Sequence, residues 1–152
     1  MIKKYEKALK AHVVRSMGRR WSYQFHEDKH SDGVPDISYG VNGVNGWIEA
    51  KYINNWPVRD TTRVKPSRFT PLQVHWLVNR QTHGGHCFVM VAVGHEIFFF
   101  PASKAAAIRD GMTRVEYYKQ SGLYFISTID TDRLVEYLSS PLHAPSLASR
   151  CE

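Results

Sequence analysis

Three charged side chains stand in the mostly apolar and small-residue stretch of residues 33–53, namely Asp36, Glu49 and Lys51. Charged side chains are seldom placed in such company unless they contact water, one another or a ligand. Successive side chains of a strand point to opposite faces of its sheet, so Glu49 and Lys51 would share a face while Ala50 points the other way. Asp36 begins the preceding strand, which a hairpin would bring alongside.

Two carboxylates held close together repel each other, and a hard divalent cation removes that repulsion. Mg²⁺ takes oxygen ligands and commonly uses one or two carboxylates together with waters and substrate phosphate. Such a metal polarises a phosphodiester, stabilises developing charge and helps to generate hydroxide from water. A neighbouring lysine can orient or deprotonate the attacking water, or stabilise the transition state. The trio therefore indicates metal-assisted chemistry on phosphate esters.

An N-terminal helix over residues 3–15 is predicted from apolar residues at spacings of three and four. Glu6 falls on its apolar stripe, whereas Lys3 and Lys10 fall on the other side. A carboxylate on that stripe lies at the rim of the core or points into a polar site. Its structural alternative is an ion pair with Lys3 or Lys10.

Strands are predicted next, over residues 21–25, 37–41 and 47–53. Two Asn-Gly turn signals within residues 42–46 indicate a hairpin between the last two of these strands. Residues 26–33 form a charged loop, and residues 54–68 form a basic loop that contains two prolines.

A second helix is predicted over residues 71–81, because Thr70, Pro71 and Gln73 supply an N-cap, a first-turn proline and a capping box. Further strands are expected over residues 87–93, 96–100, 114–118 and 123–128, the last two as a hairpin. Short helices are expected from Ser103 to Gly111 and from residue 130 or 131 to 138. The order helix, three strands, helix, strand predicts an αβββαβ core, a mixed sheet with helices packed on it.

The chain has 152 residues, 43% apolar and 22% charged, which suits one globular domain. We expect that domain over residues 1–138, its core in residues 1–100, and a disordered tail over residues 139–152. The net charge of +6 favours a polyanionic partner, nucleic acid before an anionic membrane, the alternative being a basic protein with no such partner. Lacking a bilayer-spanning apolar run and a signal peptide, the sequence indicates a cytoplasmic protein with no membrane partner.

Gly-Val-Pro-Asp at residues 33–36, followed by Glu-Ala-Lys at residues 49–51, resembles the signature of the PD-(D/E)XK nucleases. The sequence is most similar to the virus-type replication-repair nuclease (VRR-NUC) domains, with the archaeal-type Holliday junction resolvases as relatives. The resemblance covers roughly residues 1–100, and the remainder matches loosely.

In those families a helix bearing a glutamate precedes the signature and a helix with a Gln-x-x-Trp pattern follows it. Here Glu6 stands in the preceding helix, and Gln73 and Trp76 match the pattern. The resemblance implies that Glu6 is an additional acid at the site, acting on a second metal or through water, and that Gln73 supports the site. The capping box is the structural alternative for Gln73, and Trp76 is expected to pack in the core.

The resemblance also implies Mg²⁺ or Mn²⁺ as the cofactor, with no small-molecule cofactor. Asp36 and Glu49 would be its ligands, the Ala50 backbone carbonyl a third, and Lys51 would act on the nucleophilic water. The structural alternatives are a turn residue for Asp36 and a solvated ion pair for Glu49 and Lys51.

The basic loop is expected to contact DNA phosphates through Arg59, Arg63, Lys65 and Arg68. The structural alternative is an ordinary surface loop. The charged loop before Pro35 either lines the DNA path or is merely solvated, through His26, Glu27 and His30. Zinc is not expected at His83, His86 and Cys87, which lack a fourth ligand at a recognisable spacing.

The resulting hypothesis is a metal-dependent DNA endonuclease that hydrolyses phosphodiester bonds in repair, recombination or phage DNA processing. The resemblance also implies branched DNA such as Holliday junctions as the substrate and a homodimer as the assembly. A homodimer would place two active sites on two DNA strands. One alternative is a catalytically inactive nucleic-acid-binding module on the same fold. Another is a structural or partner-binding protein that is basic by accident.

Overall fold

The computed structural model describes residues 2–27 and 33–141, with the side chains of residues 5–27 and 33–141. His30 and the part of the expected tail beyond residue 141 lie outside the described residues. No helix in the described ranges combines the length and the apolar character needed to cross a membrane.

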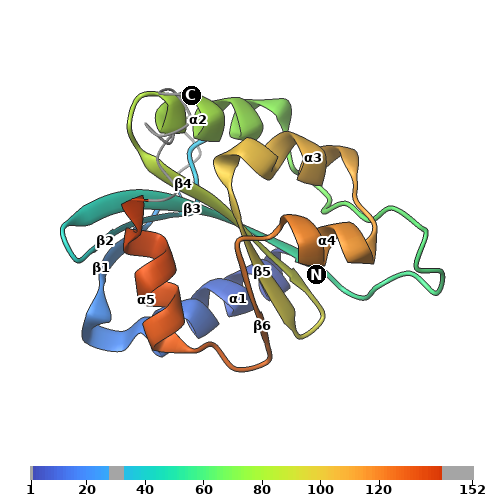
Figure 1. Cartoon of the computed structure of the whole chain (residues 1–152), viewed down its shortest axis with the longest axis horizontal. Coiled ribbons are helices and arrows are strands. Elements are labelled where there is room, and N and C mark those ends of the chain that lie inside the picture. The colour runs from blue at the N-terminus through green and yellow to red at the C-terminus, as the bar shows by residue number, and fades with distance from the viewer. Residues whose placement is uncertain (1, 28–32, 142–152) are drawn as a thin grey trace, which may run out of the picture.

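Six strands form one mixed sheet in which the spatial order equals the chain order (Figure 1). The three N-terminal strands form an antiparallel meander, β3 and β4 run parallel, and the remaining pairs are antiparallel. The strands are β1 Ser22–Phe25, β2 Ile37–Val41, β3 Val44–Ile53, β4 His86–Val93, β5 Glu96–Pro101 and β6 Leu123–Ile126. The parallel step needs a crossover, which the helix between β3 and β4 supplies.

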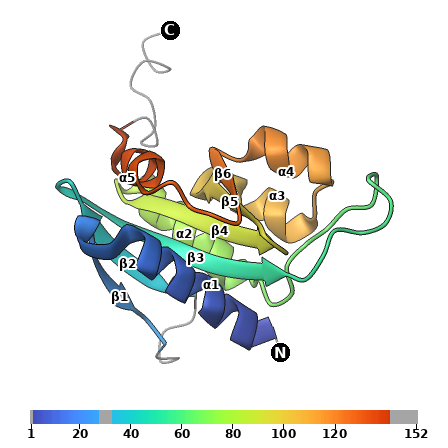
Figure 2. The same cartoon turned by 90° about the horizontal axis from the view of Figure 1, so that it is seen from below.

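Helices cover both faces of this sheet (Figures 1 and 2). One face carries α1 Ile2–Met17 and α5 Thr131–Ser139. The other carries α2 Pro71–Thr82, α3 Ala105–Asp110 and α4 Arg114–Gln120. The 3-10 turns Gly18–Arg20 and Ala102–Lys104 complete the elements. The predicted αβββαβ order, in a mixed α/β fold with flanking helices, is confirmed.

The centre of the core is β4, whose side chains are buried on both faces. Phe88 and Met90 pack toward α1 and α5, whereas Val89 and Val91 pack toward α2 and α3. All four are fully buried. Burial on both faces explains why this strand reads as an unbroken apolar run in the sequence.

The hairpin between β2 and β3 closes on the first Asn-Gly pair. Asn42 and Gly43 have φ values of 48° and 80°, as a two-residue type I′ turn requires. The second pair, residues 45–46, lies inside β3, which begins at Val44 rather than at Trp47 as predicted. Once the first turn has closed the hairpin, residues 45–46 already pair with β2, so their turn propensity has no effect.

The predicted strand over residues 114–118 is wrong, because these residues form α4. Thr113 caps this helix, its hydroxyl accepting a hydrogen bond from the Glu116 amide at 3.3 Å. This Thr-x-x-Glu capping box outweighs the strand propensity of the aromatic and β-branched residues that follow. Tyr117 is fully buried on the helix, and β6 pairs with β5 instead of with a hairpin partner.

The segment between β3 and α2 is tied to the C-terminal half of the chain at two points. Val64 and Met112 exchange backbone hydrogen bonds of 2.7 and 3.0 Å. The Trp56 indole donates a hydrogen bond to the Glu96 carboxylate, which also accepts from the Tyr118 hydroxyl and, at 3.1 Å, from Arg114. Burial raises the pKa of Glu96, but the hydrogen bonds from these three side chains outweigh it and leave the pKa below the ordinary 4.5.

A Glu96→Gln substitution is expected to destabilise the chain at neutral pH by about 1–2 kcal/mol, because a charged acceptor is lost. The pKa is lower in the folded chain, so the stabilisation is present above the unfolded-state pKa and disappears as the pH falls through the folded-state pKa. The variant should therefore lose less stability than the unaltered chain between about pH 6 and about pH 3. Urea unfolding followed by tryptophan fluorescence measures both effects, and equal acid sensitivity of the two proteins would contradict the assignment.

Candidate active site

The carboxylates of Asp36 and Glu49 meet where the ladder between β2 and β3 ends. Ile37 pairs with Ile48, so the next residue on each strand places Asp36 opposite Glu49 on one face of the sheet. Beyond Ile37 the Ala50 amide has no strand partner on that side and donates instead to Asp36 Oδ2, at 2.9 Å. Asp36 is thus held by the backbone of the strand that carries Glu49.

Glu49 is a buried carboxyl, with 2% of its surface exposed. Its Oε2 atom is buried and accepts no hydrogen bond from any described residue. Burial raises the pKa of Glu49 well above 4.5, and the charge of the neighbouring Asp36 carboxylate raises it further, whereas Lys51 lowers it. Such a group is costly to keep ionised unless a cation compensates it.

Lys51 is equally buried, with 3% of its surface exposed, and its ammonium group is held by fixed partners. Nζ donates to the Arg68 backbone carbonyl and to Gln73 Oε1, both at 3.2 Å. It lies 3.9 Å from Glu49 Oε1 and 5.2 Å from the centre of the Phe69 ring. These contacts fix the ammonium group beside Glu49. The pair of Glu49 and Lys51 is buried, so the alternative of a solvated ion pair is wrong.

Gln73 has two roles at once at the start of α2. Its Oε1 accepts a hydrogen bond from the Thr70 amide at 3.0 Å, and its own amide donates to the Thr70 hydroxyl at 3.2 Å, which completes the predicted capping box. The same Oε1 accepts from Lys51. The capping role and the contact with the site are therefore both present, and neither excludes the other.

Glu6 reaches the same end of the sheet from α1. Burial raises its pKa above 4.5; the charge of Asp36 also raises it, while Lys51, Lys10 and Arg68 lower it. The structure thus brings Glu6 into the electrostatic range of the other predicted site residues.

Lys10 is a site residue that the sequence analysis placed on the wrong side of the helix. Its side chain is 12% exposed, with Nζ 3.9 Å from Asp36 Oδ1 and 5.5 Å from the centre of the Phe25 ring. Residues four apart share a helix face, so the spacing from Glu6 to Lys10 was the signal that could have found it.

All four basic side chains of the loop over residues 54–68 are exposed: Arg59, Arg63, Lys65 and Arg68. Arg63 donates to the Gly111 carbonyl at 3.0 Å, a structural contact. Arg68 adjoins the site through its carbonyl and has a φ of 62°, an uncommon value for a residue with a side chain. The contact of all four side chains with phosphates stays a prediction.

His26 and His83, two of the histidines singled out in the sequence, have different partners. His26 Nε2 lies 2.8 Å from the Ser38 hydroxyl, and the imidazole packs on Trp47 at 5.0 Å between ring centres. Glu27 is exposed. His83 Nδ1 lies 2.8 Å from a carbonyl oxygen of α2. Within residues 2–27 and 33–141 no three His, Cys, Asp or Glu side chains converge closely enough to hold a metal ion by themselves.

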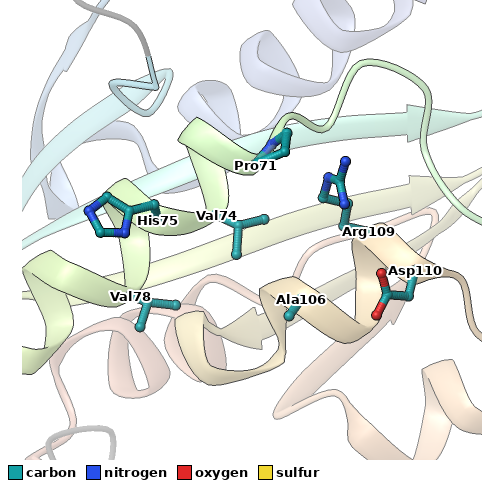
Figure 3. A pocket seen from close by; sticks show the side chains of 7 residues that line it. All are labelled: Pro71, Val74, His75, Val78, Ala106, Arg109 and Asp110. Carbon is teal, nitrogen blue, oxygen red and sulfur yellow. The ribbon is translucent and has the colours of Figure 1, made fainter.

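A cavity lies between α2 and α3 (Figure 3). Figure 3 shows its lining from both helices, Pro71, Val74, His75 and Val78 on one side and Ala106, Arg109 and Asp110 on the other. Arg109 Nε donates to the Phe69 carbonyl at 3.0 Å. A helix outside the predicted αβββαβ core therefore helps to place the Arg68–Phe69 turn.

Solved structures similar to this chain include a Holliday junction resolvase and a homing endonuclease. Archaeoglobus fulgidus Hjc, a Holliday junction resolvase from an archaeal hyperthermophile, is 16% identical over 75% of this chain and 97% of its own, with a TM-score of 0.46. The bacterial homing endonuclease I-Ssp6803I is 15% identical over 82% of this chain and 74% of its own, with a TM-score of 0.43. No protein-family model matches the chain, and no curated protein matches it in sequence.

Proposed function

We propose that the chain is a metal-dependent DNA endonuclease of the PD-(D/E)XK type. One observation carries the proposal: Asp36 and Glu49 face each other at a strand end, Glu49 has a buried oxygen that no described residue satisfies, and Lys51 is fixed beside them. A buried, unsatisfied carboxylate oxygen next to a second carboxylate is a costly arrangement for a purely structural role.

The donor set fits a hard divalent cation such as Mg²⁺ or Mn²⁺. Asp36 and Glu49 would supply carboxylate oxygens. The amide and carbonyl of one strand residue point to the same side, and the Ala50 amide points to Asp36, so the Ala50 carbonyl is the natural third protein donor. Mg²⁺ usually keeps waters and substrate phosphate as further ligands, so a third acidic side chain is not required. When bound, the cation would polarise the phosphodiester and lower the pKa of water.

The other site residues would stabilise charge on the phosphate, move a proton or position the DNA. The Lys51 ammonium, fixed by Arg68 and Gln73, would stabilise negative charge on the reacting phosphate or orient the water. Glu6, with its raised pKa, would hold or accept a proton through water near the same centre. Arg68 would contact a neighbouring phosphate, because its side chain is exposed and its backbone carbonyl is bonded to Lys51 at the site.

DNA is the substrate that the basic charge and the site together favour, and an enzyme acting on cellular or phage DNA would work in the cytoplasm. A homodimer acting on branched DNA is the arrangement we propose for the assembly, since it would place two such sites on two strands.

The direct test is incubation of the full chain with labelled four-way junction, nicked and linear DNA, with Mg²⁺, Mn²⁺ or EDTA. Cleavage of at least one of these DNAs is expected with the metals and none with EDTA. Absence of cleavage of every DNA with both metals, or cleavage that persists in EDTA, would refute the proposed function.

A nucleic-acid-binding module without hydrolysis is the second candidate. The observation in its favour is that no three acidic, His or Cys side chains converge among the described residues. It predicts DNA binding with a steep salt dependence that a Glu49→Gln substitution leaves unchanged, and no cleavage under any of the above conditions.

The two roles of Gln73 can be separated with Thr70 as the matched comparison. Thr70→Ala and Gln73→Ala each break the capping box, so each is expected to cost about 1 kcal/mol of stability. Only Gln73→Ala also removes an acceptor from Lys51, and we expect it to slow cleavage about tenfold more than Thr70→Ala does. Thermal unfolding and single-turnover cleavage measure the two effects, and equal cleavage by the two variants would show that Gln73 is a cap alone.

A further inference from the structure

Three aromatic rings form a continuous ladder along β1. The ring centres of Trp21 and Tyr23 are 5.5 Å apart, and those of Tyr23 and Phe25 are 5.3 Å apart. Alternate residues of a strand share one face, so the three rings line up on the same side. Trp21 is 7% exposed, whereas Tyr23 and Phe25 are 43% and 36% exposed. The ladder therefore begins in the core and emerges to solvent toward Phe25.

The exposed end of this ladder adjoins the candidate active site. Phe25 pairs with Ile37, the residue after Asp36, and the His26 amide donates to the Asp36 carbonyl at 2.8 Å. Lys10 joins the two features, because its Nζ lies 5.5 Å from the Phe25 ring centre and 3.9 Å from Asp36 Oδ1. The rings share the α1 face of the sheet with Ile37, whereas Asp36 and Glu49 point to the other face at the strand end, which Lys10 reaches from α1. A nucleic-acid strand lying on the rings would thus meet the Lys10 charge before it rounds the strand end to the carboxylates.

We propose that Tyr23 and Phe25 stack on unpaired bases of the DNA whose scissile phosphate lies at Asp36. The inference rests on the function proposed above and extends it to a substrate class: DNA with a single-stranded segment beside the cleaved bond. Base faces are open to an aromatic ring only when the bases are unpaired and splayed apart, since in a duplex the neighbouring pairs cover them. Exposed aromatic rings on a β-sheet are a recurrent platform for such bases.

A second copy of this chain is the competing occupant, because β1 stands at the edge of the sheet (Figure 2). Charge favours nucleic acid. Arg19 is exposed just before β1, as is Arg20, which pairs with Asp132 at 2.7 Å, and Lys10 lies at the far end of the strand. Two copies paired along β1 would bring these like charges together, whereas a phosphate backbone complements them.

The proposal is tested by fluorescence anisotropy of the full chain with labelled DNA in EDTA, so that cleavage plays no part. The probes are a single strand, the corresponding duplex, and the same duplex with a single-stranded flap. Tyr23→Ala and Phe25→Ala are each expected to weaken binding to the single strand and the flap about tenfold, and to leave duplex binding within about twofold. Tyr23→Phe, which keeps the ring, should bind like the unaltered chain.

Tyr124→Ala is the matched control, since Tyr124 is also 43% exposed but stands on β6 at the opposite edge of the sheet. It should leave binding to all three probes unchanged. The proposal would be overturned if the β1 variants lost equal affinity for duplex and single strand, or if neither variant lost affinity. It would also be overturned if light scattering showed that a β1 variant changes the oligomeric mass of the protein while its DNA binding stays the same. Binding is read without metal, so failure here is distinct from absence of cleavage, which concerns the proposed function.

Discussion

An Asp36→Asn variant is expected to lose metal-dependent cleavage by at least about a thousandfold, because it removes one of the two negative charges that would hold the cation. The fold should survive, since the side-chain oxygen of the introduced asparagine can still accept the hydrogen bond that the Ala50 amide donates to Asp36 Oδ2. Single-turnover cleavage of the DNA that the unaltered chain cuts best, at saturating enzyme, measures the chemical step without a contribution from binding.

The control for this variant is the same change at an exposed carboxylate. Asp132 is 86% exposed and pairs with Arg20 at 2.7 Å on the surface, where ion pairs contribute little. Asp132→Asn should cleave at the rate of the unaltered chain. Both variants should also keep the thermal unfolding temperature within a few degrees. Undiminished cleavage by Asp36→Asn would remove Asp36 from the site and with it the proposed cation.

A Glu49→Gln variant is expected to change activity and stability in opposite directions. Cleavage should fall by a factor similar to that for Asp36→Asn, since the second carboxylate is lost. In the absence of metal, however, the variant should be more stable than the unaltered chain at neutral pH by about 1 kcal/mol, because functional sites commonly hold groups that cost stability. For a chain of this size that corresponds to a rise of about 3 °C in the unfolding temperature.

The direction follows from the pKa of Glu49, which burial and the neighbouring Asp36 raise above 4.5. A group whose pKa is higher in the folded chain contributes its stabilisation below the unfolded-state pKa and loses it as the pH rises through the folded-state pKa. The metal-free chain should therefore lose stability as the pH rises above the unfolded-state pKa of Glu49, and Glu49→Gln should lose less. The variant keeps both hydrogen bonds that hold Lys51.

Metal binding supplies the second half of this test. Added Mg²⁺ or Mn²⁺ should raise the unfolding temperature of the unaltered chain by mass action and should raise that of Glu49→Gln much less. Thermal unfolding in EDTA and across a metal titration gives both readings. If Glu49→Gln were less stable than the unaltered chain in EDTA at neutral pH, the role of Glu49 would be structural, through its ion pair with Lys51.

Local sequence patterns predicted most of the elements that carry the site. Alternation along β3 placed Glu49 and Lys51 on one face with Ala50 opposite, and the structure confirms that Ala50 is fully buried in the core toward α1. The capping box at Thr70 fixed the start of α2. Such features depend on residues within a few positions of one another, so periodicity and turn chemistry are enough to predict them.

Local patterns gave a wrong prediction where a helix-capping signal competed with strand propensity. The box formed by Thr113 and Glu116 is as clear in the sequence as that at Thr70, yet the aromatic residues after it favoured a strand. Lys10 was predicted on the outer side of its helix, although its spacing of four from Glu6 puts the two residues on one face. The charge of a lysine does not decide its environment when a carboxylate lies within reach.

The sequence by itself determined which residues carry the acids and the lysine, which strand faces they occupy, and the order of elements that holds them. The tertiary structure alone decided what these charges contact. Lys51 is fixed by the Arg68 carbonyl and by Gln73, Lys10 reaches Asp36, and the rings of β1 come out beside it. These contacts join residues far apart in the chain, and their distances depend on how the helices pack on the sheet, which no local pattern encodes.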